Sequence, residues 1–327
     1  MSTALASIVI RDAPGASAES RQRILQAADE LGYRPDTRAR MLRSRHSRLL
    51  GVVFGVQHAF HGDLVSGLYQ AADRIGYDLA LSAVTPERDE QQAVSSLLQD
   101  RCEALILLGP HTSTPYLAEL AARLPVVVVA RAVRHRAVDV VRTADDEGLH
   151  QAVDHLVALG HRDIAHIDGG RAPGAADRRR GYREALRRHG LDARTRIVPG
   201  GLTEDDGAAA AQAIVGISAG QRPTAVSVFN DRCATGVLDV LRRAGLAVPA
   251  DISVVGYDNS RLARLSHIDL TTIAQDTQQI TALAITRAVA RLDGAAVAHR
   301  ELVIPPTLVV RSTTAAPPAD GAGQRPR

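Results

Sequence analysis

Short apolar segments alternate with amphipathic ones over most of the chain, beginning at residue 49. The apolar segments are rich in β-branched residues and are predicted to be strands. They are Leu49–Gly55, Asp78–Val84, Ala104–Gly109, Val126–Val129, Val138–Thr143, Ile164–Asp168, Ala225–Asn230 and Ile252–Asp258. Between them, helical spacing of apolar residues predicts helices at Leu64–Ile75, Gln91–Leu98, Gly148–Leu159, Asp177–His189 and Ala234–Ala244. This alternation predicts an α/β fold with parallel sheets covered by helices on both faces, and the number of elements favours two lobes.

Glycines mark the ends of several predicted helices. Gly76, Gly160, Gly190 and Gly245 each follow an amphipathic segment and precede the next turn or strand. A helix that ends there needs a residue in the left-handed conformation, which glycine adopts at little cost. We therefore expect these four glycines to have positive φ angles.

The first 48 residues have a different pattern. Thr3–Ile10 is predicted to be a short helix with Ser2 as its N-cap, and a second helix is predicted to begin after Ser17 and end at Gly32. Residues 37–44 could form one or two cationic helical turns, which are marginal alone in water. At the other end, residues 313–327 are rich in Pro and Gly and are predicted to be a disordered tail.

Positive charge is concentrated at the N-terminus of this 327-residue chain, whose formal net charge is +3. Residues 1–48 contain nine arginines and five acidic residues, whereas residues 49–327 contain 30 arginines and 31 acidic residues. The entire excess therefore lies in the first segment. Such a segment is typical of a polyanion-binding headpiece, although a solvated basic linker would look the same.

Several classes of protein are disfavoured by what the sequence lacks. There is no apolar stretch of the roughly 20 residues that a membrane span needs and no signal peptide, so we expect a cytoplasmic protein without a membrane partner. Cys102 and Cys233 are isolated, which argues against a disulfide framework or a zinc site. The chain has no lysine and therefore no phosphate-binding GxxxxGK[ST] loop, and it lacks GxSxG and HExxH motifs. We expect no enzymatic activity, cofactor or metal.

An ordered series of motifs resembles the lactose repressor/galactose repressor (LacI/GalR) family. Residues 2–35, STALASIVIRDAPGASAESRQRILQAADELGYRP, are similar to the DNA-binding headpiece of that family. Further matching segments are LLGVV (49–53), HLVALGHRDIA (155–165), RRRGYREAL (178–186), PTAV (223–226), FND (229–231), VPADISVVGYD (248–258) and LTTI (270–273). The resemblance implies a sequence-specific transcriptional repressor, a homodimer whose affinity for double-stranded operator DNA is controlled by a small-molecule effector.

The resemblance also implies a domain organisation. Residues 1–35 would be a partial helix-turn-helix headpiece, 36–48 a hinge helix and 49–312 a two-lobed core like that of periplasmic sugar-binding proteins. The first lobe would comprise residues 49–145 and 276–295, and the second would comprise residues 146–275 and 296–312. The effector would bind between the lobes and would be a sugar or a sugar derivative.

The chain departs from the family at its start, because Met1 stands where members end an additional helix and turn. Without that helix we expect Leu5, Ile8 and Val9 to lose apolar cover and the headpiece to fold poorly. Two explanations remain open: a start codon assigned too far downstream, or a true truncation that leaves an effector-binding protein without DNA binding. A sugar-binding transport protein is a further alternative, opposed by the missing signal peptide and the basic N-terminus.

The resemblance assigns candidate DNA-binding residues to two segments. The start of the recognition helix would read the major groove through short side chains, namely Ser2, Thr3, Ala4 and Ser7. Alternatively, this segment is simply a short buried helix. In the hinge, Leu42 would insert into the minor groove, and the remaining candidates there are Arg38, Ala39, Arg40 and Arg43.

Candidate effector-binding residues lie at strand ends. Arg178, Asn230 and Asp258 match polar ligand-contacting positions of the family, and their guanidinium, amide and carboxylate groups suit the hydroxyls of a sugar. An alternative for Arg178 and Asp258 is a structural ion pair. The first lobe would contribute Phe60, His61 and Asp63 from the segment after its first strand. Ala130 stands where many sugar-responsive relatives have an aspartate, which suggests an effector with fewer hydroxyls than a free sugar.

Overall fold

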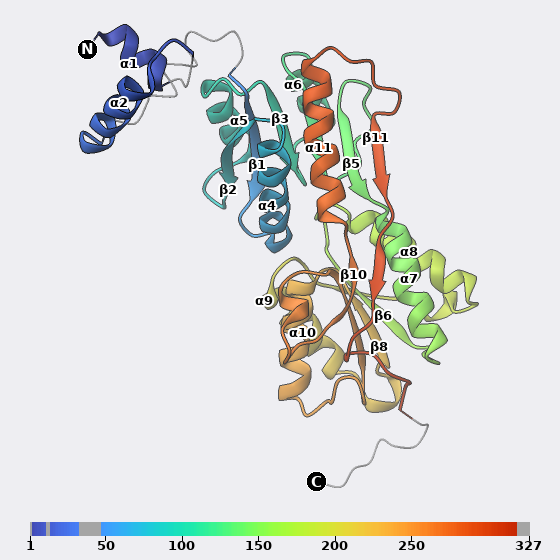
Figure 1. The fold of residues 1–327 in the computed structure, drawn as a ribbon. Coiled ribbons are helices and arrows are strands. Elements are labelled where there is room, and N and C mark those ends of the chain that lie inside the picture. Colours follow the sequence, from blue (N-terminus) through green and yellow to red (C-terminus); the bar gives the residue numbers. More distant parts are fainter. Residues whose placement is uncertain (1, 11–13, 33–46, 319–327) are drawn as a thin grey trace. The chain divides into compact units, whose positions relative to one another are not determined.

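The computed structural model describes residues 2–10, 14–32 and 47–318, and the chain divides into two compact units, Met1–Ser47 and Arg48–Arg327. The first unit contains α1 (Thr3–Ile10) and α2 (Ala18–Glu30), as predicted (Figure 1). Ser2 and Ser17 cap them: Ser2 Oγ accepts from the Leu5 amide at 3.2 Å, and Ser17 Oγ from the Ser20 amide at 3.3 Å. Of the three residues expected to lose apolar cover, Val9 is buried, whereas Leu5 and Ile8 are half-buried. The predicted hinge segment 37–44 lies outside the described residues.

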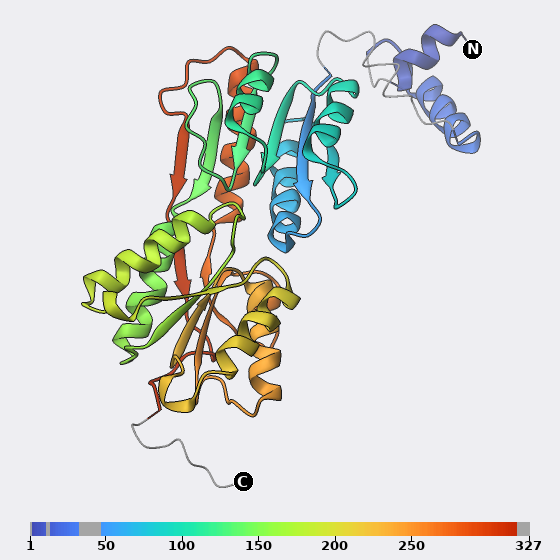
Figure 2. The same ribbon diagram turned by 180° about the vertical axis from the view of Figure 1, so that it is seen from behind.

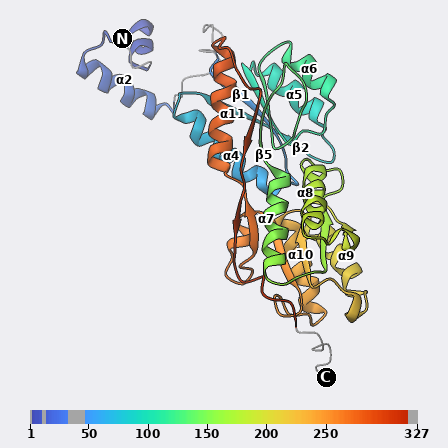
Figure 3. The ribbon, with the colours of Figure 1, turned by 90° about the vertical axis from the view of Figure 1, so that its right-hand side faces the viewer.

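The second unit consists of two α/β lobes, each built on a six-stranded sheet (Figures 1 and 2). The sheet of the first lobe has the strand order β11-β5-β4-β3-β1-β2, and all its pairings are parallel. Its strands are β1 (Leu49–Gly55), β2 (Asp78–Val84), β3 (Ala104–Leu108), β4 (Val126–Val129), β5 (Asp139–Thr143) and β11 (Glu301–Ile304). Helices α4 (Ala59–Asp73) and α11 (Thr277–Leu292) pack together on one face (Figure 3). Helices α5 (Glu90–Gln99) and α6 (Thr114–Ala121) cover the other.

Strand β3 shows why this sheet is apolar throughout. Ile106 packs into the core beneath α4 and α11, whereas Leu105 and Leu107 pack into the core beneath α5 and α6. Successive side chains of a strand point to opposite faces, so a strand covered on both sides is continuously apolar. The four buried valines of β4 follow the same rule.

The second lobe repeats this architecture with the strand order β12-β10-β9-β8-β6-β7, in which only β12 is antiparallel to its neighbour. Its strands are β6 (Ile164–Asp168), β7 (Arg196–Pro199), β8 (Ala225–Val228), β9 (Ser253–Asp258), β10 (Thr271–Ala274) and β12 (Thr307–Val309). Helices α7 (Asp145–Ala158) and α8 (Ala175–Arg188) cover one face, and α9 (Glu204–Val215) and α10 (Asp231–Arg243) the other. Short 3-10 helices lie at Asp192–Arg194, Ala219–Gln221 and Leu262–Arg264.

The predicted α/β elements are confirmed, with differences at their ends. Every predicted strand is present, and Gly76, Gly160, Gly190 and Gly245 have φ angles of +70°, +105°, +69° and +76°. Strands β7, β10, β11 and β12 and helices α6, α9 and α11 were not predicted. Strands β7, β11 and β12 lie at sheet edges and are only partly buried, and β10 begins with two threonines. None of the four shows the fully buried segment that marks β4 and β8, which are equally short.

The chain crosses between the lobes three times, and the third crossing differs from the expectation. The first two crossings lie at residue 144 and at residues 275–276, between β5 and α7 and between β10 and α11. The third was expected near residue 296 but lies at Pro305–Pro306, because β11 still belongs to the first lobe, where it pairs with β5. Residues 296–304 were therefore assigned to the wrong lobe. Two prolines cannot donate to a sheet, which ends β11 at this point.

The disordered tail was predicted to begin at residue 313, but the first residues of this segment are ordered against the second lobe. Thr313 is 4% exposed, and its hydroxyl accepts from the Thr271 amide at 2.9 Å and donates to the Val254 carbonyl at 2.7 Å. The Ala315 amide donates to Ser253 Oγ at 3.1 Å. These polar groups are satisfied by β9 and β10, so the start of the segment is part of the second lobe. Among the described helices, none combines the length and apolar character needed to cross a membrane.

Candidate functional site

A polar cavity of about 50 Å³ lies between the two lobes of the second unit. Parallel strands of both sheets end here, so helix starts and loops from both lobes meet. The first lobe and its loops contribute His58, Ala59, Phe60, His61, Gly109 and Ala130 to the wall. The second lobe contributes Asp145, Pro173, Arg178, Leu202, Phe229, Asn230, Arg232, Asp258 and Ser260, and the second crossing contributes Gln275. Five of the six effector-binding candidates therefore line one cavity.

Arg178 is the most constrained of these residues. It lies in the first turns of α8 and is 5% exposed. Its Nε donates to Asp145 Oδ1 at 2.8 Å, and a terminal nitrogen donates to the Phe229 carbonyl at 2.5 Å. The guanidinium carbon is 3.5 Å from the centroid of the Tyr257 ring. Ion pairing, hydrogen bonding and cation–π contact hold the guanidinium plane in one orientation at the cavity wall.

Asp258 lies close to Arg178 but is bonded to a crossing segment. Its Oδ1 accepts from Gln275 Nε2 at 2.7 Å, while the nearest Arg178 nitrogen is 4.0 Å away. Gln275 Oε1 in turn accepts from the Thr143 hydroxyl at 2.6 Å. The main ion pair of Arg178 is thus with Asp145 rather than with Asp258. Burial raises the pKa of Asp258 to about 8, and the neighbouring Asp231 carboxylate acts in the same direction while Arg178 opposes it.

Asn230 combines a structural role with its place in the cavity wall. As the N-cap of α10, its Oδ1 accepts from the Cys233 amide at 2.7 Å, and its Nδ2 donates to the Leu202 carbonyl at 3.2 Å. The adjacent Asp231 is fully buried and accepts from the Thr272 hydroxyl and the Ser260 amide at 2.6 and 2.7 Å. The end of β8 is therefore a rigid platform for polar contacts.

The first-lobe candidates lie within the first five residues of α4 instead of in a loop. His61 is 5% exposed, and its Nδ1 accepts from the Gly55 amide at 3.0 Å, which places the proton of the neutral ring on Nε2. Phe60 is buried between the core and the cavity. Asp63 is half-exposed and lines neither this cavity nor the neighbouring one. At 100° a residue, Asp63 lies about 160° round the helix from His61, and so it is directed away from the side on which His61 meets the cavities.

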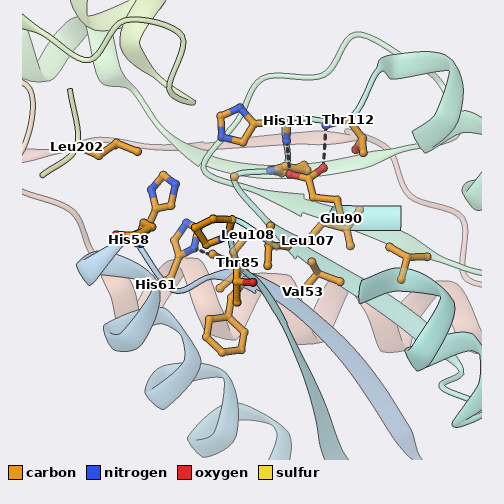
Figure 4. A pocket seen from close by; sticks show the side chains of 18 residues that line it. Val53, His58, His61, Thr85, Glu90, Leu107, Leu108, His111, Thr112 and Leu202 are labelled. Atoms are coloured by element: carbon orange, nitrogen blue, oxygen red, sulfur yellow. Dashed lines mark hydrogen bonds between the residues drawn. The ribbon is translucent and has the colours of Figure 1, made fainter. Parts of the chain in front are cut away.

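A second cavity of about 280 Å³ lies beside the first, at the strand ends of the first lobe (Figure 4). The two cavities share His58, His61, Gly109 and Leu202. The His58 and His61 rings are stacked, with centroids 4.4 Å apart and planes inclined by 11°, and the His111 ring is 6.4 Å from that of His58. Burial, reinforced by the neighbouring imidazoles, lowers the pKa of His58 to about 4 and that of His61 to about 3. Both rings are neutral at physiological pH.

Several residues of the site were not predicted from the sequence. Gln275 lies in the second crossing and Asp145 directly follows the first, whereas His58 and Arg232 each lie two residues from a predicted residue. Asp145 lies two residues beyond the end of β5 and begins α7, so an acidic residue just past a strand end was a signal that could have identified it. Gln275 follows β10, which the pattern did not reveal.

The remaining sequence-based candidates concern metals and DNA. Among the described residues, no cluster of three or more His, Cys, Asp or Glu side chains could hold a metal ion. Thr3, Ala4 and Ser7 lie in α1, and Ser2 caps it. The hinge candidates Arg38, Ala39, Arg40, Leu42 and Arg43 lie outside the described residues.

Comparison with known proteins gives concordant results. Residues 153–314 match the family of periplasmic binding protein-like domains. The chain is 31% identical to the HTH-type transcriptional regulator GalR of Salmonella typhimurium (strain LT2), over 98% of this chain and 95% of that protein. It resembles the crystal structure of a LacI transcriptional regulator from Rhodococcus species, with a TM-score of 0.78, 53% identity and coverage of 82% of this chain and 98% of that one. It also resembles the Lac repressor dimer bound to operator and the anti-inducer ONPF, with a TM-score of 0.80, 29% identity and coverage of 97% and 96%.

Proposed function

Since the chain belongs to the LacI/GalR family of transcriptional regulators, we propose that it is a dimeric repressor whose operator affinity is set by a sugar-like effector bound between the lobes. The observation that carries this proposal is the convergence of Arg178, Asn230 and Asp258 on one cavity that Phe60 and His61 of the other lobe also line. The relatives compared are transcriptional regulators, and no catalytic step or cofactor is part of the proposal.

The polar residues would bind the effector through complementary hydrogen bonds. Arg178 offers N–H donors in a fixed plane, and Asp258 presents acceptor oxygens when it is ionised. The His61 Nε2–H, whose position is fixed by the Gly55 amide, would donate to an acceptor on the same ligand. A ligand that makes these contacts touches both lobes, so its binding free energy depends on how the lobes are arranged.

The crossing segments would connect effector binding to DNA binding. Asp145 directly follows the first crossing, Gln275 lies in the second, and both line the cavity. Through Asp145–Arg178 and Gln275–Asp258, the effector-binding side chains are bonded directly to the segments about which the lobes would rotate. Effector and operator would then favour different arrangements of the lobes, which is a coupling between two sites.

On the DNA side, we propose a headpiece at residues 1–35 and a hinge at residues 36–48. Ser2, Thr3, Ala4 and Ser7 would face base edges in the major groove. Leu42 would insert into the minor groove, and the adjoining Arg38, Arg40 and Arg43 would contact phosphates, with Ala39 packed beside the wedge.

The test is selection of an operator from a random duplex library with the full chain, followed by affinity measurements with and without ligand. We expect a preferred sequence, and we expect Leu42→Ala to weaken operator binding at least tenfold while effector affinity stays unchanged. Leu81→Ala, on an exposed edge of the first lobe, is the matched control and should leave both affinities unchanged. Absence of any sequence preference in every ligand state would overturn the repressor proposal and leave an effector-binding protein without DNA binding.

A further inference from the structure

One side chain bonds the two lobes to each other away from the crossing segments. Arg232, in the first turn of α10, donates from Nη1 to the Gln57 carbonyl at 2.7 Å and from Nε to Glu204 Oε2 at 2.7 Å. Gln57 lies between β1 and α4 in the first lobe, whereas Arg232 and Glu204 belong to the second. The guanidinium group therefore bridges the lobes, with one acceptor on each.

This bond lies far from the segments about which the lobes would rotate. The chain passes to the second lobe from β5 and from β11, which occupy one edge of the first sheet, whereas β4 and β3 separate β5 from β1 (Figure 1). Three strand spacings amount to about 14 Å. A rotation about the crossings displaces the end of β1 more than it displaces the hinge itself. The Arg232–Gln57 bond would therefore break early in such a rotation.

On the second-lobe side, Arg232 is held on a rigid base. Glu204 begins α9, which packs closely on α10, since a Cβ at Gly236 would collide with the Glu204 carbonyl oxygen. The loop before α9 is bonded to α10 as well, because Asn230 Nδ2 donates to the Leu202 carbonyl at 3.2 Å. The single Nε hydrogen of Arg232 is taken by Glu204, so the terminal nitrogens are the donors that remain for the first lobe.

On the first-lobe side, Gln57 lies in a turn that is fixed by backbone bonds. The Val56 amide donates to the Val84 carbonyl at the end of β2, at 3.2 Å. The His61 amide, in the first turn of α4, donates to the His58 carbonyl at 3.0 Å rather than to that of Gln57. The turn is therefore held on both sides of Gln57, and its carbonyl accepts from the other lobe.

The charges around Arg232 favour the bridge. Glu204 supplies the negative countercharge, and the Arg232 side chain is only 25% exposed. Burial lowers the pKa of His58 to about 4, and the nearby His111 and Arg232 act in the same direction. The imidazole beside the turn is therefore neutral and does not repel the guanidinium. A charge-assisted hydrogen bond to a carbonyl is stronger than one between neutral groups.

We propose that Arg232 is a positioning residue, which sets the equilibrium between the bridged and the open arrangement of the lobes through its bond to the Gln57 carbonyl. Loss of this bond would raise the population of the open arrangement even without an effector. The inference rests on the proposed function in one respect, namely that the arrangement of the lobes controls operator affinity.

The experiment measures the distance between the lobes in the ligand-free full chain by double electron–electron resonance. Spin labels are attached at Gln91→Cys on α5 and Ala209→Cys on α9, which are exposed positions, whereas Cys102 and Cys233 are buried. The labelled chain is mixed with an excess of unlabelled chain, so that a dimer carries one pair. We expect one main distance in this background, and about a tenfold larger population at longer distances when Arg232→Ala is added.

Two further variants separate the bridge from general effects of losing an arginine. Arg196→Ala is the matched control, because Arg196 Nη1 donates to the Gln221 carbonyl at 3.0 Å within the second lobe. It removes the same kind of bond and should leave the distances unchanged. Glu204→Gln keeps the side-chain shape but weakens its hold on Arg232. It should give a smaller shift in the direction of Arg232→Ala, and it remains informative if that variant folds poorly.

Equal distance distributions with and without Arg232→Ala would overturn the inference, and so would an equal shift in Arg196→Ala. Operator affinity is measured separately, on unlabelled variants and the sequence that the wild type selects. A change of about fivefold or more in Arg232→Ala would support both proposals. A longer lobe distance with unchanged operator affinity would sustain the role of Arg232 and contradict the repressor mechanism. Unchanged distances in a chain with a preferred operator would do the reverse.

Discussion

Arg178 of α8 donates its Nε hydrogen to Asp145 Oδ1 at 2.8 Å, with both side chains almost completely buried. The bond joins a proposed effector-binding residue to the first residue after a crossing between the lobes. Gly174 lies against the same carboxylate, since a Cβ at residue 174 would be only 2.9 Å from Asp145 Oδ2. Arg178 and the first crossing are therefore held together by direct contacts, and we expect a substitution at either one to affect the position of the other.

Asp145→Ala should lower the free energy of unfolding by about 3 kcal/mol, because it leaves a buried guanidinium without its anionic partner. The neighbouring pair Asp146–Arg180 provides the control. It has a comparable distance of 2.7 Å but is half-exposed, so Asp146→Ala should cost less than about 1 kcal/mol. Urea unfolding of both variants measures the difference. An equal loss of unfolding free energy in the two variants would contradict the larger contribution expected from the buried Asp145–Arg178 pair.

Gly236→Ala should destabilise the second lobe by about 2 to 3 kcal/mol. A Cβ at residue 236 would lie 1.9 Å from the Glu204 carbonyl oxygen, and Gly207 makes the reciprocal contact with the Cys233 carbonyl oxygen. Helices α9 and α10 would have to separate. Gly62→Ala is the control, because a Cβ there meets nothing within 4 Å, and alanine should stabilise α4 by up to about 1 kcal/mol. The two variants should shift the urea midpoint in opposite directions.

Ending the chain at residue 312 should lower its stability, whereas ending it at residue 318 should have little effect. The first truncation removes the buried Thr313 hydroxyl, with its bonds to β9 and β10, and the Ala315 amide bond to Ser253. At about 1 kcal/mol for each hydrogen bond, we expect a loss of about 2 to 3 kcal/mol and a lower Tm. Identical melting curves for the two truncations would show that residues 313–318 contribute nothing.

The stability difference between wild type and Asp258→Asn should depend on pH. Burial raises the pKa of Asp258 from 3.8 to about 8, so the folded chain keeps this proton where the unfolded chain releases it. The stability that this group contributes is complete below about pH 4 and is lost as the pH rises to about 8. Asparagine does not titrate, and it is the side chain closest in size and shape to the aspartate that adopts a φ of +111° at this position.

The free energy of unfolding of Asp258→Asn should therefore rise relative to that of the wild type as the pH rises from 5 to 8, by at most about 1.4 kcal/mol per pH unit. Urea unfolding at four pH values in this interval measures the gap. A gap that is constant with pH would mean that Asp258 ionises in the folded chain at its ordinary pKa.

The residues of the site that were predicted are those tied to local motifs. Arg178 precedes a glycine at which α8 crosses α7, and Asp258 ends a continuous apolar strand. The sequence motifs around Arg178 and Asp258 were enough to predict that Arg178 lies near the start of a helix and that Asp258 lies at the end of a strand. Asp63 lines neither cavity, and it was included because the start of α4 was set too late, at residue 64 instead of 59, so that residues 60–63 were treated as a loop.

The amphipathic periods, glycine caps and apolar strands are local properties, and they determined by themselves that this chain forms helices and parallel strands in two lobes. The arginine-rich start and the ordered motifs determined its resemblance to a family. The tertiary structure alone decided that Asp145 pairs with Arg178, that Gln275 bonds to Asp258, that β11 joins the first lobe and that a larger cavity opens beside the polar one. Each of these depends on contacts between segments far apart in the chain, whose pairing follows from the packing of whole sheets and helices and leaves no periodic mark in the sequence.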